Sequence, residues 1–599
     1  MVELRRMWVA LVTGLALAAG LLGSAASAQE ESPSAAPSGG DEPVVFTIGD
    51  TREIRNVNPI SQVNAIDAWV NYFMYDYLIE FSQEDLSPVP GLAESWTQSE
   101  DGLTWTFKLR EGLRWSDGEP ITAHDYEWFA NFVVDENVGE YIDQFPFTDS
   151  VTATNDTTIV WKTTRPTLQP GQPGSLILPE HIFGDMTKKE VLEYPNDDNP
   201  VVSGPFTITE WDKGQFLRME RNPEYYKGQP HIDELVFRQF GTAETVVQAL
   251  ERGTIDFAEY IPAPLFATLE NAPNIETHVG GAATFANLNF NVYEGDKDST
   301  GHPALLDVDV RRAIAHAIDK QKLIDVALGG YGTPGSTVIM PAFAQWHYEP
   351  TAEETIPFDL TEANAILDEA GYMDGDGDGV RETPDGQPLE LRLLSDGSDS
   401  ASAKMVPFMK GWLEQIGIDT KTSAVTSSAI LDRYYDLDFD MYIYGWSAGP
   451  DPDFMLSTFT TDQCLVWSDT CYSNEEYDDL YEQQRRSYDP QERAQLVDDL
   501  QRHLYENVPE MVLYYDNDLE AYRSDRWTGF VENPSPDGYL LDQFTMYSAM
   551  SVRPIEGDVG TAAEAEGGVS GIVWVAIAAA VIVVIGATIA VRRRREERD

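Results

Sequence analysis

The segment 91–129 has the most strongly constrained local structure in the chain. Gly102 and Gly118 each follow an Asp, and Asp-Gly pairs supply the positive backbone dihedral that a tight turn needs. Between the two turns, apolar side chains recur at every second residue and therefore share one face of a strand: Leu103, Trp105, Phe107 and Leu109. Thr122 is a suitable N-cap for a helix that begins near Ala123. The segment predicts a β-meander that leads into a helix.

Strand-like and helix-like patterns alternate along the middle of the chain. The runs 44–48 and 439–444 have the pattern of strands, and 308–326 has the periodicity of a helix. With 599 residues, of which 42% are hydrophobic and 11% aromatic, the chain is long enough for two or three domains with large cores. No internal repeat is present, so the sequence predicts an α/β fold.

The chain is strongly acidic. It has 101 Asp and Glu residues against 40 Lys and Arg residues, which gives a formal net charge of −61. A field of this sign repels nucleic acid and anionic lipid surfaces. We therefore expect no nucleic-acid partner.

The N-terminus has the composition of an export signal. Two arginines precede an apolar run at 7–22, and the Ala-Ser-Ala at 26–28 has the small-x-small form of a signal-peptidase site. We expect 1–28 to be a signal peptide, followed by a low-complexity linker at 29–43.

A second apolar segment lies at the C-terminus. Residues 571–591 contain no charge and would span about 31 Å as a helix, which matches the hydrocarbon core of a bilayer. Four arginines follow at once, and positive residues stay on the cytoplasmic side. The alternative is a buried core helix. The sequence predicts a linker at 551–570, a transmembrane helix at 571–591 and a cytoplasmic tail at 592–599, with the bulk of the protein on the extracellular or periplasmic side of the cell membrane.

The chain has two cysteines, Cys464 and Cys471. Two thiols do not make a four-ligand zinc site. In an oxidising compartment we expect them to form a disulfide that closes a short loop. The alternative is two free thiols.

Residues 374–385 have the spacing of a calcium-binding loop. Aspartates occupy its first, third and fifth positions, and Gly379 occupies the sixth, where a sharp turn is required. The predicted ligands are Asp374, Asp376, Asp378, the carbonyl of Val380, Glu382 and Asp385. The predicted role of Ca²⁺ is structural, because it would hold a loop between a helix that ends near 370 and a strand that begins near 389. The alternative is an acidic surface turn.

Several short motifs occur in an order that is typical of one family. They are the segment 91–129, Ser203-Gly204-Pro205-Phe206, Glu220-Arg221-Asn222-Pro223, the run 285–291 and Tyr472-Ser473-Asn474. In this order they resemble the extracytoplasmic solute-binding proteins of family 5, which are the dipeptide-, oligopeptide- and nickel-binding receptors of ABC importers.

The resemblance implies a two-lobed periplasmic-binding-protein type II fold (cluster C) with an extra subdomain in the first lobe. Lobe I would comprise 44–90, 200–285 and 516–550, the extra subdomain 91–199, and lobe II 286–515. Ligand is expected between the lobes, which close over it as hinged bodies. The expected partners are the permease and ATPase subunits of an ABC importer, and we expect a monomer.

The resemblance places the ligand site near Trp446, just after a strand. In peptide-binding members, an aromatic residue is followed three positions later by an Asp that pairs with the α-ammonium of the peptide. Here that position is Gly449, and Asp451 lies two residues further on. An exposed Trp without a fixed anion also suits a neutral sugar, so a peptide, an oligosaccharide and other small organic solutes stay open as ligands. Further predicted cleft contacts are Tyr444, Asn58 and Asn289. The alternative for Trp446 is a core aromatic.

No catalytic motif is present in the sequence. It has no GxSxG nucleophile elbow, no HExxH pair and no phosphate-binding loop, and its eight histidines are scattered. We therefore expect a solute-binding protein and not an enzyme. One alternative is a cell-surface sensor that uses the same fold and docks to a separate receptor. Another is an extracellular hydrolase, because paired carboxylates are abundant.

Overall fold

The computed structural model describes residues 43–555, apart from 63, 448, 488 and 542–545. The predicted signal peptide, most of both linkers, the predicted transmembrane helix at 571–591 and the predicted tail lie outside the described residues. Among the residues that are described, no helix combines the length and the apolar character needed to cross a membrane.

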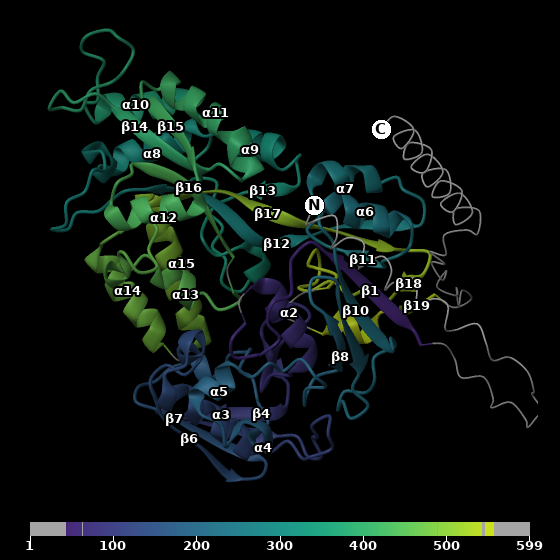
Figure 1. Ribbon diagram of the computed structural model, residues 1–599. Helices are drawn as coiled ribbons and strands as arrows, with labels where there is room; N and C mark the ends of the chain where they lie inside the picture. The colour runs from purple at the N-terminus through teal and green to yellow at the C-terminus, as the bar shows by residue number, and fades with distance from the viewer. Residues whose placement is uncertain (1–42, 63, 448, 488, 542–545, 556–599) are drawn as a thin grey trace, which may run out of the picture. The chain divides into compact units, whose positions relative to one another are not determined.

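One mixed sheet runs through the described part of the chain (Figure 1). Its strands follow the order β15 (Asp419–Val425), β14 (Glu390–Asp396), β16 (Met441–Ser447), β12 (Ile275–Phe290), β17 (Glu510–Arg523), β11 (Phe257–Ala258), β1 (Val45–Asp50), β10 (Glu234–Gln239), β9 (Phe216–Arg221) and β8 (Phe206–Asp212). β13 (Gly332–Pro334) pairs with β17 beside this path. β1 is parallel to β10 and β11, and β14 is parallel to β15 and β16, so each end of the sheet has the parallel pairing of an α/β fold.

The antiparallel pair of β12 and β17 joins the two ends of this sheet. These strands have 16 and 14 residues, and β17 pairs with β11 on one side while β12 pairs with β16 on the other. β17 is rich in apolar and aromatic residues, which suit a strand, and it is buried along most of its length. Asp516 and Asn517 in its middle are only half-buried, and the register with β12 shifts at this point. β1 and β8–β11 fall in the ranges assigned above to lobe I, and β13–β16 in those of lobe II, so we call the two ends the lobe I sheet and the lobe II sheet.

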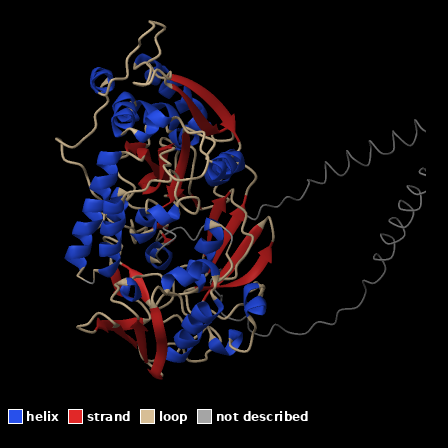
Figure 2. Ribbon diagram, turned by 90° about the vertical axis from the view of Figure 1, so that its left-hand side faces the viewer, coloured by secondary structure: helices blue, strands red, loops and turns tan. Residues whose placement is uncertain are grey.

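A separate antiparallel sheet lies within the range of the extra subdomain (Figure 2). Its order is β4 (Ala93–Gln98), β5 (Thr104–Leu109), β7 (Thr158–Thr163) and β6 (Thr148–Asn155). Trp105, Phe107 and Leu109 are buried on one face of β5, as their spacing predicted. On β7, the ring of Trp161 stacks on that of Phe145 with centroids 4.9 Å apart, so aromatic packing holds this sheet to the segment before it.

The predicted turns and helix start of the segment 91–129 are confirmed. Gly102 and Gly118 have φ angles of 70° and 90°, which a residue with a Cβ adopts only at a cost. Thr122 caps α3 (Ala123–Glu136) in a capping box with Asp125.

The helix predicted at 308–326 is wrong as a single element. The chain forms α8 (Val308–Ala317) and α9 (Lys320–Ala327), because Ile318 is extended and Asp319 accepts a hydrogen bond from the backbone N–H of Lys322. An Asp at an N-cap begins a new helix, and the apolar periodicity continues across the break.

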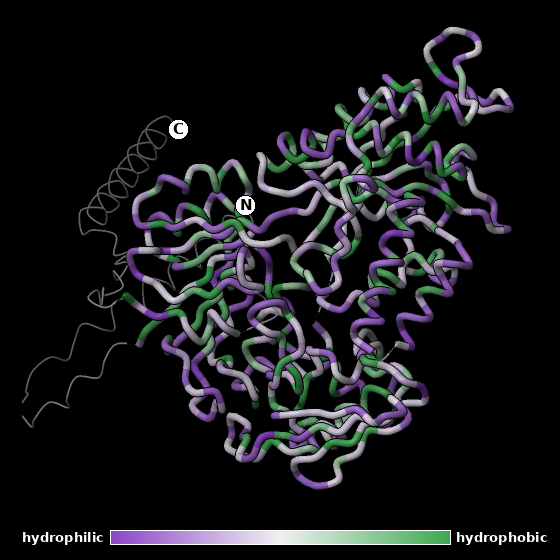
Figure 3. The backbone as a smooth tube through the Cα atoms, turned by 180° about the vertical axis from the view of Figure 1, so that it is seen from behind, coloured by the Kyte–Doolittle hydropathy of each residue, from purple (hydrophilic) through white to green (hydrophobic). Residues whose placement is uncertain are grey.

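Other elements outside these sheets are short strands and helices of up to 18 residues. Their bounds are α2 (Ala65–Met74), β2 (Ile79–Phe81), β3 (Pro88–Pro90), η1 (Gly139–Gln144), α4 (Glu180–Phe183), α5 (Lys188–Leu192), α6 (Ala243–Glu251), α7 (Ala263–Leu269), α10 (Leu360–Glu369), α11 (Ser400–Gln415), α12 (Ser427–Asp436), α13 (Asp453–Ser457), α14 (Glu475–Arg486), α15 (Pro490–Asn507), β18 (Trp527–Thr528), α16 (Tyr547–Ser551) and β19 (Arg553–Pro554). Hydrophobic and hydrophilic residues alternate along many of these elements (Figure 3), as expected where one face is buried.

Candidate functional site

A cavity of about 370 Å³ lies at the carboxyl ends of β14 and β16. In open α/β sheets, ligands bind beyond the carboxyl ends of the parallel strands. Tyr444 and Trp446 of β16 line this cavity together with Asp396, Asp399 and Asp516. Burial, followed by repulsion from Asp399, raises the pKa of Asp516 to about 6. We call this the smaller cavity. Of the described residues that line it, none is basic, so its walls favour a positively charged or hydrogen-donating group.

The indole of Trp446 is hydrogen-bonded to the carboxylate of Asp469, a residue that the sequence did not single out. Its N–H donates to Asp469 Oδ2 at 2.6 Å, and the hydroxyl of Tyr442 donates to Asp469 Oδ1 at 3.0 Å. Asp469 lies inside the loop that the disulfide between Cys464 and Cys471 closes. Burial raises the pKa of Asp469 to about 6, against the two hydrogen bonds. An acidic residue between the two cysteines was the only sequence signal for this contact.

A larger cavity of about 1010 Å³ lies between the extra subdomain and the segment that follows β16. Gly449 and Asp451 line it, and aromatic side chains line it from both sides: Phe81, Phe145, Phe147, Phe454, Trp467 and Tyr481. Trp467 and Phe454 keep 52% and 43% of their surface exposed. Exposed aromatic rings that line a cavity provide apolar contact area for a ligand.

Two arginines flank Phe147 at the edge of the larger cavity. The guanidinium of Arg165 lies 3.4 Å from the centroid of the Phe147 ring, and that of Arg485 lies 5.1 Å from it. Arg165 Nη1 is also 3.4 Å from Glu482 Oε2 on α14, so this cluster connects the extra subdomain to a helix in the lobe II range.

Asp451 is engaged within the protein. The guanidinium of Arg493 donates to both of its carboxylate oxygens at 2.8 Å, and Arg493 Nε donates to Gln484 Oε1 at 3.1 Å. Burial alone would raise the pKa of Asp451, but the charge of Arg493 outweighs it and the pKa is lowered. The 6% exposure of the Arg493 side chain makes this a largely buried pair.

Asn58 and Asn289 are not among the residues that line the two cavities. Asn58 is buried, and its amide nitrogen donates to the carbonyls of Val191 and Tyr194 at 2.7 and 2.9 Å. Asn289 is also buried and exchanges amide hydrogen bonds with Asn287 at 3.1 and 3.2 Å. Both side chains are thus occupied by contacts within the fold.

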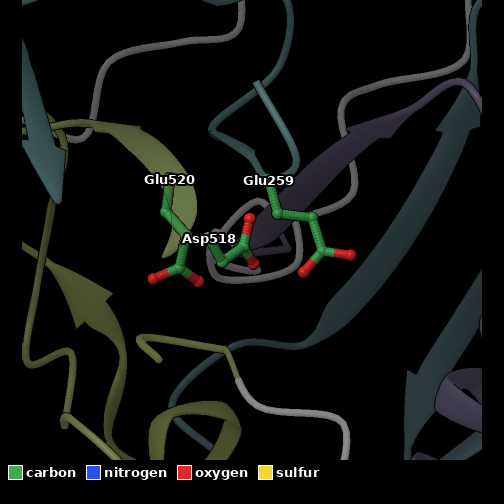
Figure 4. A group of neighbouring side chains, drawn as sticks. All are labelled: Glu259, Asp518 and Glu520. Carbon is green, nitrogen blue, oxygen red and sulfur yellow. The ribbon is translucent and has the colours of Figure 1, made fainter. Parts of the chain in front are cut away.

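An acidic cluster lies where β1 and β11 end. Glu259 follows β11, and Asp518 and Glu520 are neighbours on one face of β17 (Figure 4). Glu259 forms an ion pair with Arg52, and Asp518 Oδ1 accepts from the backbone N–H of Tyr260 at 3.0 Å. Burial, and then the Asp518 carboxylate, raise the pKa of Glu259 despite Arg52. One oxygen from each acid lies within 4.8 Å of the others, which is the spacing of a cation site, but Arg52 already supplies a positive charge there.

The predicted calcium loop brings three of its residues together. Oxygens of Asp374, Asp376 and Glu382 lie within 4.8 Å of one another. The carboxylate of Asp374 accepts from the backbone N–H of Gly377 at 2.7 Å, and that of Asp378 accepts from Val380 at 2.8 Å. Asp385 is exposed and is not part of this group.

Comparison with known proteins identifies the family to which this chain belongs. The model of the bacterial extracellular solute-binding proteins, family 5 Middle, matches residues 87–464. The chain belongs to this family. This membership confirms the resemblance seen in the sequence, and it makes the protein a solute-binding receptor of an ABC importer and not an enzyme.

Relatives of this family 5 protein cover most of its length. The oligopeptide-binding protein AppA of Bacillus subtilis is 25% identical over 90% of this chain and 99% of its own. The glutathione-binding protein GsiB of Escherichia coli K12 is 27% identical over 73% of this chain and 82% of its own. The structure of the substrate-binding protein CtaP of Listeria monocytogenes matches with a TM-score of 0.72 and 22% identity, over 85% of this chain and 99% of that one. These likenesses confirm the two-lobed α/β fold.

The ion pair of Asp451 predicts a structural role for this residue. Asp451→Ala leaves the buried guanidinium of Arg493 without its anion, so we expect the free energy of unfolding to fall by about 3 kcal/mol in urea titrations. Asp479→Ala is the matched control, because Asp479 is an exposed acid on α14, and it should change the free energy by less than about 0.5 kcal/mol. Unchanged stability combined with weaker ligand binding in Asp451→Ala would instead assign its carboxylate to the ligand.

Proposed function

We propose that this family 5 protein captures an oligopeptide, or an organic solute of similar size, in the larger cavity and delivers it to the permease and ATPase of an ABC importer. The observation that carries the proposal is the cavity itself. Its volume of about 1010 Å³ lies at the upper end of the range of ligand pockets, roughly 300–1,000 Å³, and suits an extended ligand better than a single sugar ring.

The lining of the larger cavity supports a peptide. Polar side chains line it together with the aromatic rings, among them Gln172, Gln345 and Gln463. Rings accept side chains of varied shape, and amides pair with the N–H and C=O groups of a peptide backbone. The structure of AppA of Bacillus subtilis in complex with a nonapeptide matches this chain with a TM-score of 0.66 and 22% identity, over 86% of this chain and 100% of that one.

The ligand class is tested by incubating the purified protein with a mixture of peptides and maltooligosaccharides. Native mass spectrometry should then show adducts of the protein with peptides. Trp467→Ala should weaken peptide affinity by about tenfold in calorimetry, because an aromatic contact contributes on the order of 1.5 kcal/mol. Tyr435→Ala is the matched control, since Tyr435 is an aromatic of α12 with 46% exposure outside both cavities. Sugar adducts without peptide adducts would contradict the proposal.

We further propose that the protein is held at the membrane by the apolar segment 571–591. The absence of charge in this segment and the four arginines after it support a single span with the folded part outside. The full chain should therefore stay with membranes in alkaline carbonate, and a chain that ends at residue 570 should be released. Release of the full chain would argue against this anchor.

The loop 374–385 is proposed as a structural calcium site. Clustered carboxylates repel one another, and a divalent cation relieves that repulsion. Removal of Ca²⁺ with EDTA should lower the melting temperature of the protein, and readdition should restore it. In a variant that carries both Asp374→Asn and Asp376→Asn, the melting temperature should no longer respond to EDTA, whereas Asp385→Asn should keep a response because Asp385 stands apart. An equal response in the double variant would place the ion elsewhere.

A further inference from the structure

Arg485 is the only basic residue among the described residues that line the larger cavity. It lies in the last turn of α14, in the lobe II range, and its side chain is 27% exposed. The net charge of the chain, −61, repels an anionic group of a ligand. Any binding of such a group in this cavity therefore depends on a local cation, and Arg485 is the exception in the wall that provides one.

Two aromatic rings of the same cavity contact the guanidinium of Arg485. Its central carbon lies 5.1 Å from the centroid of the Phe147 ring and 5.5 Å from that of the Tyr481 ring. Both rings also line the larger cavity. A guanidinium that lies over a ring keeps its N–H groups at its own edge, where they can pair with an anion. The rings thus fix the position of the cation without using its donors.

The backbone of Phe147 has an unusual conformation. Its φ angle is 56°, in the left-handed region that a bulky residue seldom adopts. The carbonyl of Phe147 accepts from the backbone N–H of Thr164 at 2.7 Å and from the hydroxyl of Thr164 at 3.2 Å, and these bonds hold the residue in place. Such conformations persist where the surrounding contacts determine them, and they cluster at functional sites.

None of the described residues accepts a hydrogen bond from the Arg485 side chain. Its nitrogens lie 3.6 Å from an oxygen of Asp453 and 3.7 Å from one of Glu482, which is too long for a hydrogen bond. Both acids have closer partners. Gln484 Nε2 donates to Asp453 Oδ1 at 2.6 Å, and Arg486 Nη2 donates to Glu482 Oε2 at 2.8 Å. A guanidinium has five N–H donors, so those of Arg485 remain available for a ligand.

Positive charge is in excess around Arg485. Arg165 and Arg486 belong to the same cluster, and the acids that accompany the three arginines are Asp453 and Glu482. Burial lowers the pKa of Arg165, and the charges of Arg485 and Arg486 lower it further against the attraction of Glu482. A carboxylate placed beside these arginines would relieve the repulsion between like charges.

We propose that the guanidinium of Arg485 is a subsite for a carboxylate of the ligand. This inference rests on the proposed function, because the carboxylate belongs to the solute that the larger cavity captures. A guanidinium pairs with a carboxylate through two parallel N–H···O bonds, which are stronger than bonds between neutral groups. In a peptide, the C-terminal carboxylate and the side chain of an acidic residue both have this chemistry.

Pairs of alanine pentapeptides test the subsite and distinguish its two sources. One pair compares a free C-terminal carboxylate with the C-terminal amide, and the other pairs compare glutamate with glutamine at each position of the amidated peptide. Calorimetry on the full-length protein should show that the carboxylate member of one pair binds about tenfold more tightly than its uncharged partner. The pair that shows this ratio identifies the source of the carboxylate.

Substitution of Arg485 should remove this ratio. In Arg485→Gln it should fall to near one without weakening the uncharged peptide, and in Arg485→Lys it should stay at about threefold, because an ammonium keeps the charge and loses the two-bond geometry. Arg486→Gln is the matched control, because it removes the same charge from the next residue, whose side chain is 62% exposed and outside the lining of the cavity. An equal fall of the ratio in Arg485→Gln and Arg486→Gln would overturn the subsite.

A second probe keeps the subsite separate from the peptide proposal. At an ionic strength matched with sodium chloride, sodium butyrate should raise the melting temperature of the wild type and of Arg486→Gln but not that of Arg485→Gln, whereas butyramide should affect all three proteins alike. Equal affinities within every peptide pair, or equal butyrate shifts in the wild type and Arg485→Gln, would overturn the subsite and leave peptide binding intact. If no pentapeptide binds and butyrate still acts only where Arg485 is present, the subsite stands and the peptide proposal fails.

Discussion

The pairing of β12 with β17 is the constraint on which the rest of the structure depends. Both strands belong to the lobe I sheet at one end and to the lobe II sheet at the other, so a single ladder of hydrogen bonds joins the halves. Because the parallel strands on either side end toward the middle of this pair, the acidic and aromatic side chains at their carboxyl ends lie near it. The register shift beside Asp516 is the point where the ladder is least regular. An irregularity of this kind bends a strand while its pairing continues on either side.

Many of the residues near these strand ends are carboxylates. Several of them accept hydrogen bonds or form an ion pair with one arginine. Arg52 forms an ion pair with Glu259, and Arg493 forms one with Asp451. Asp469 has no arginine partner among these contacts. Its carboxylate accepts hydrogen bonds from the indole of Trp446 and the phenol of Tyr442, and burial raises its pKa. The large negative charge of the chain is thus more than a solvated surface, because part of it is drawn into the walls of the cavities, where it selects for donors and cations.

Local patterns were predicted well, and contacts between distant segments were not. The turns at Gly102 and Gly118 and the cap at Thr122 depend on residues within a few positions, so the sequence alone determines them. The break at Asp319 was missed because apolar periodicity continues through it. The family motifs identified the receptor fold because they sample the whole chain in order.

The two cavities near β16 are shaped by long-range contacts. Asp451 and Arg493 are 42 residues apart, so neither neighbourhood indicates that the carboxylate is engaged. Trp446 and Asp469 are 23 residues apart, and a loop closed by the disulfide places them together.

Gly449 shows what these contacts mean for ligand choice. A Cβ built at Gly449 would meet no atom within 4 Å, and its backbone needs no positive φ, so neither packing nor conformation requires glycine there. The loop has room for the Asp that the peptide binders of the family place at this position, yet this chain has none. The nearest substitute in sequence, Asp451, is held by Arg493. Neither position 449 nor Asp451 therefore offers a free carboxylate to the amine of a peptide. Carboxylates at other positions line both cavities: Asp396, Asp399 and Asp516 in the smaller one and Asp453 in the larger one.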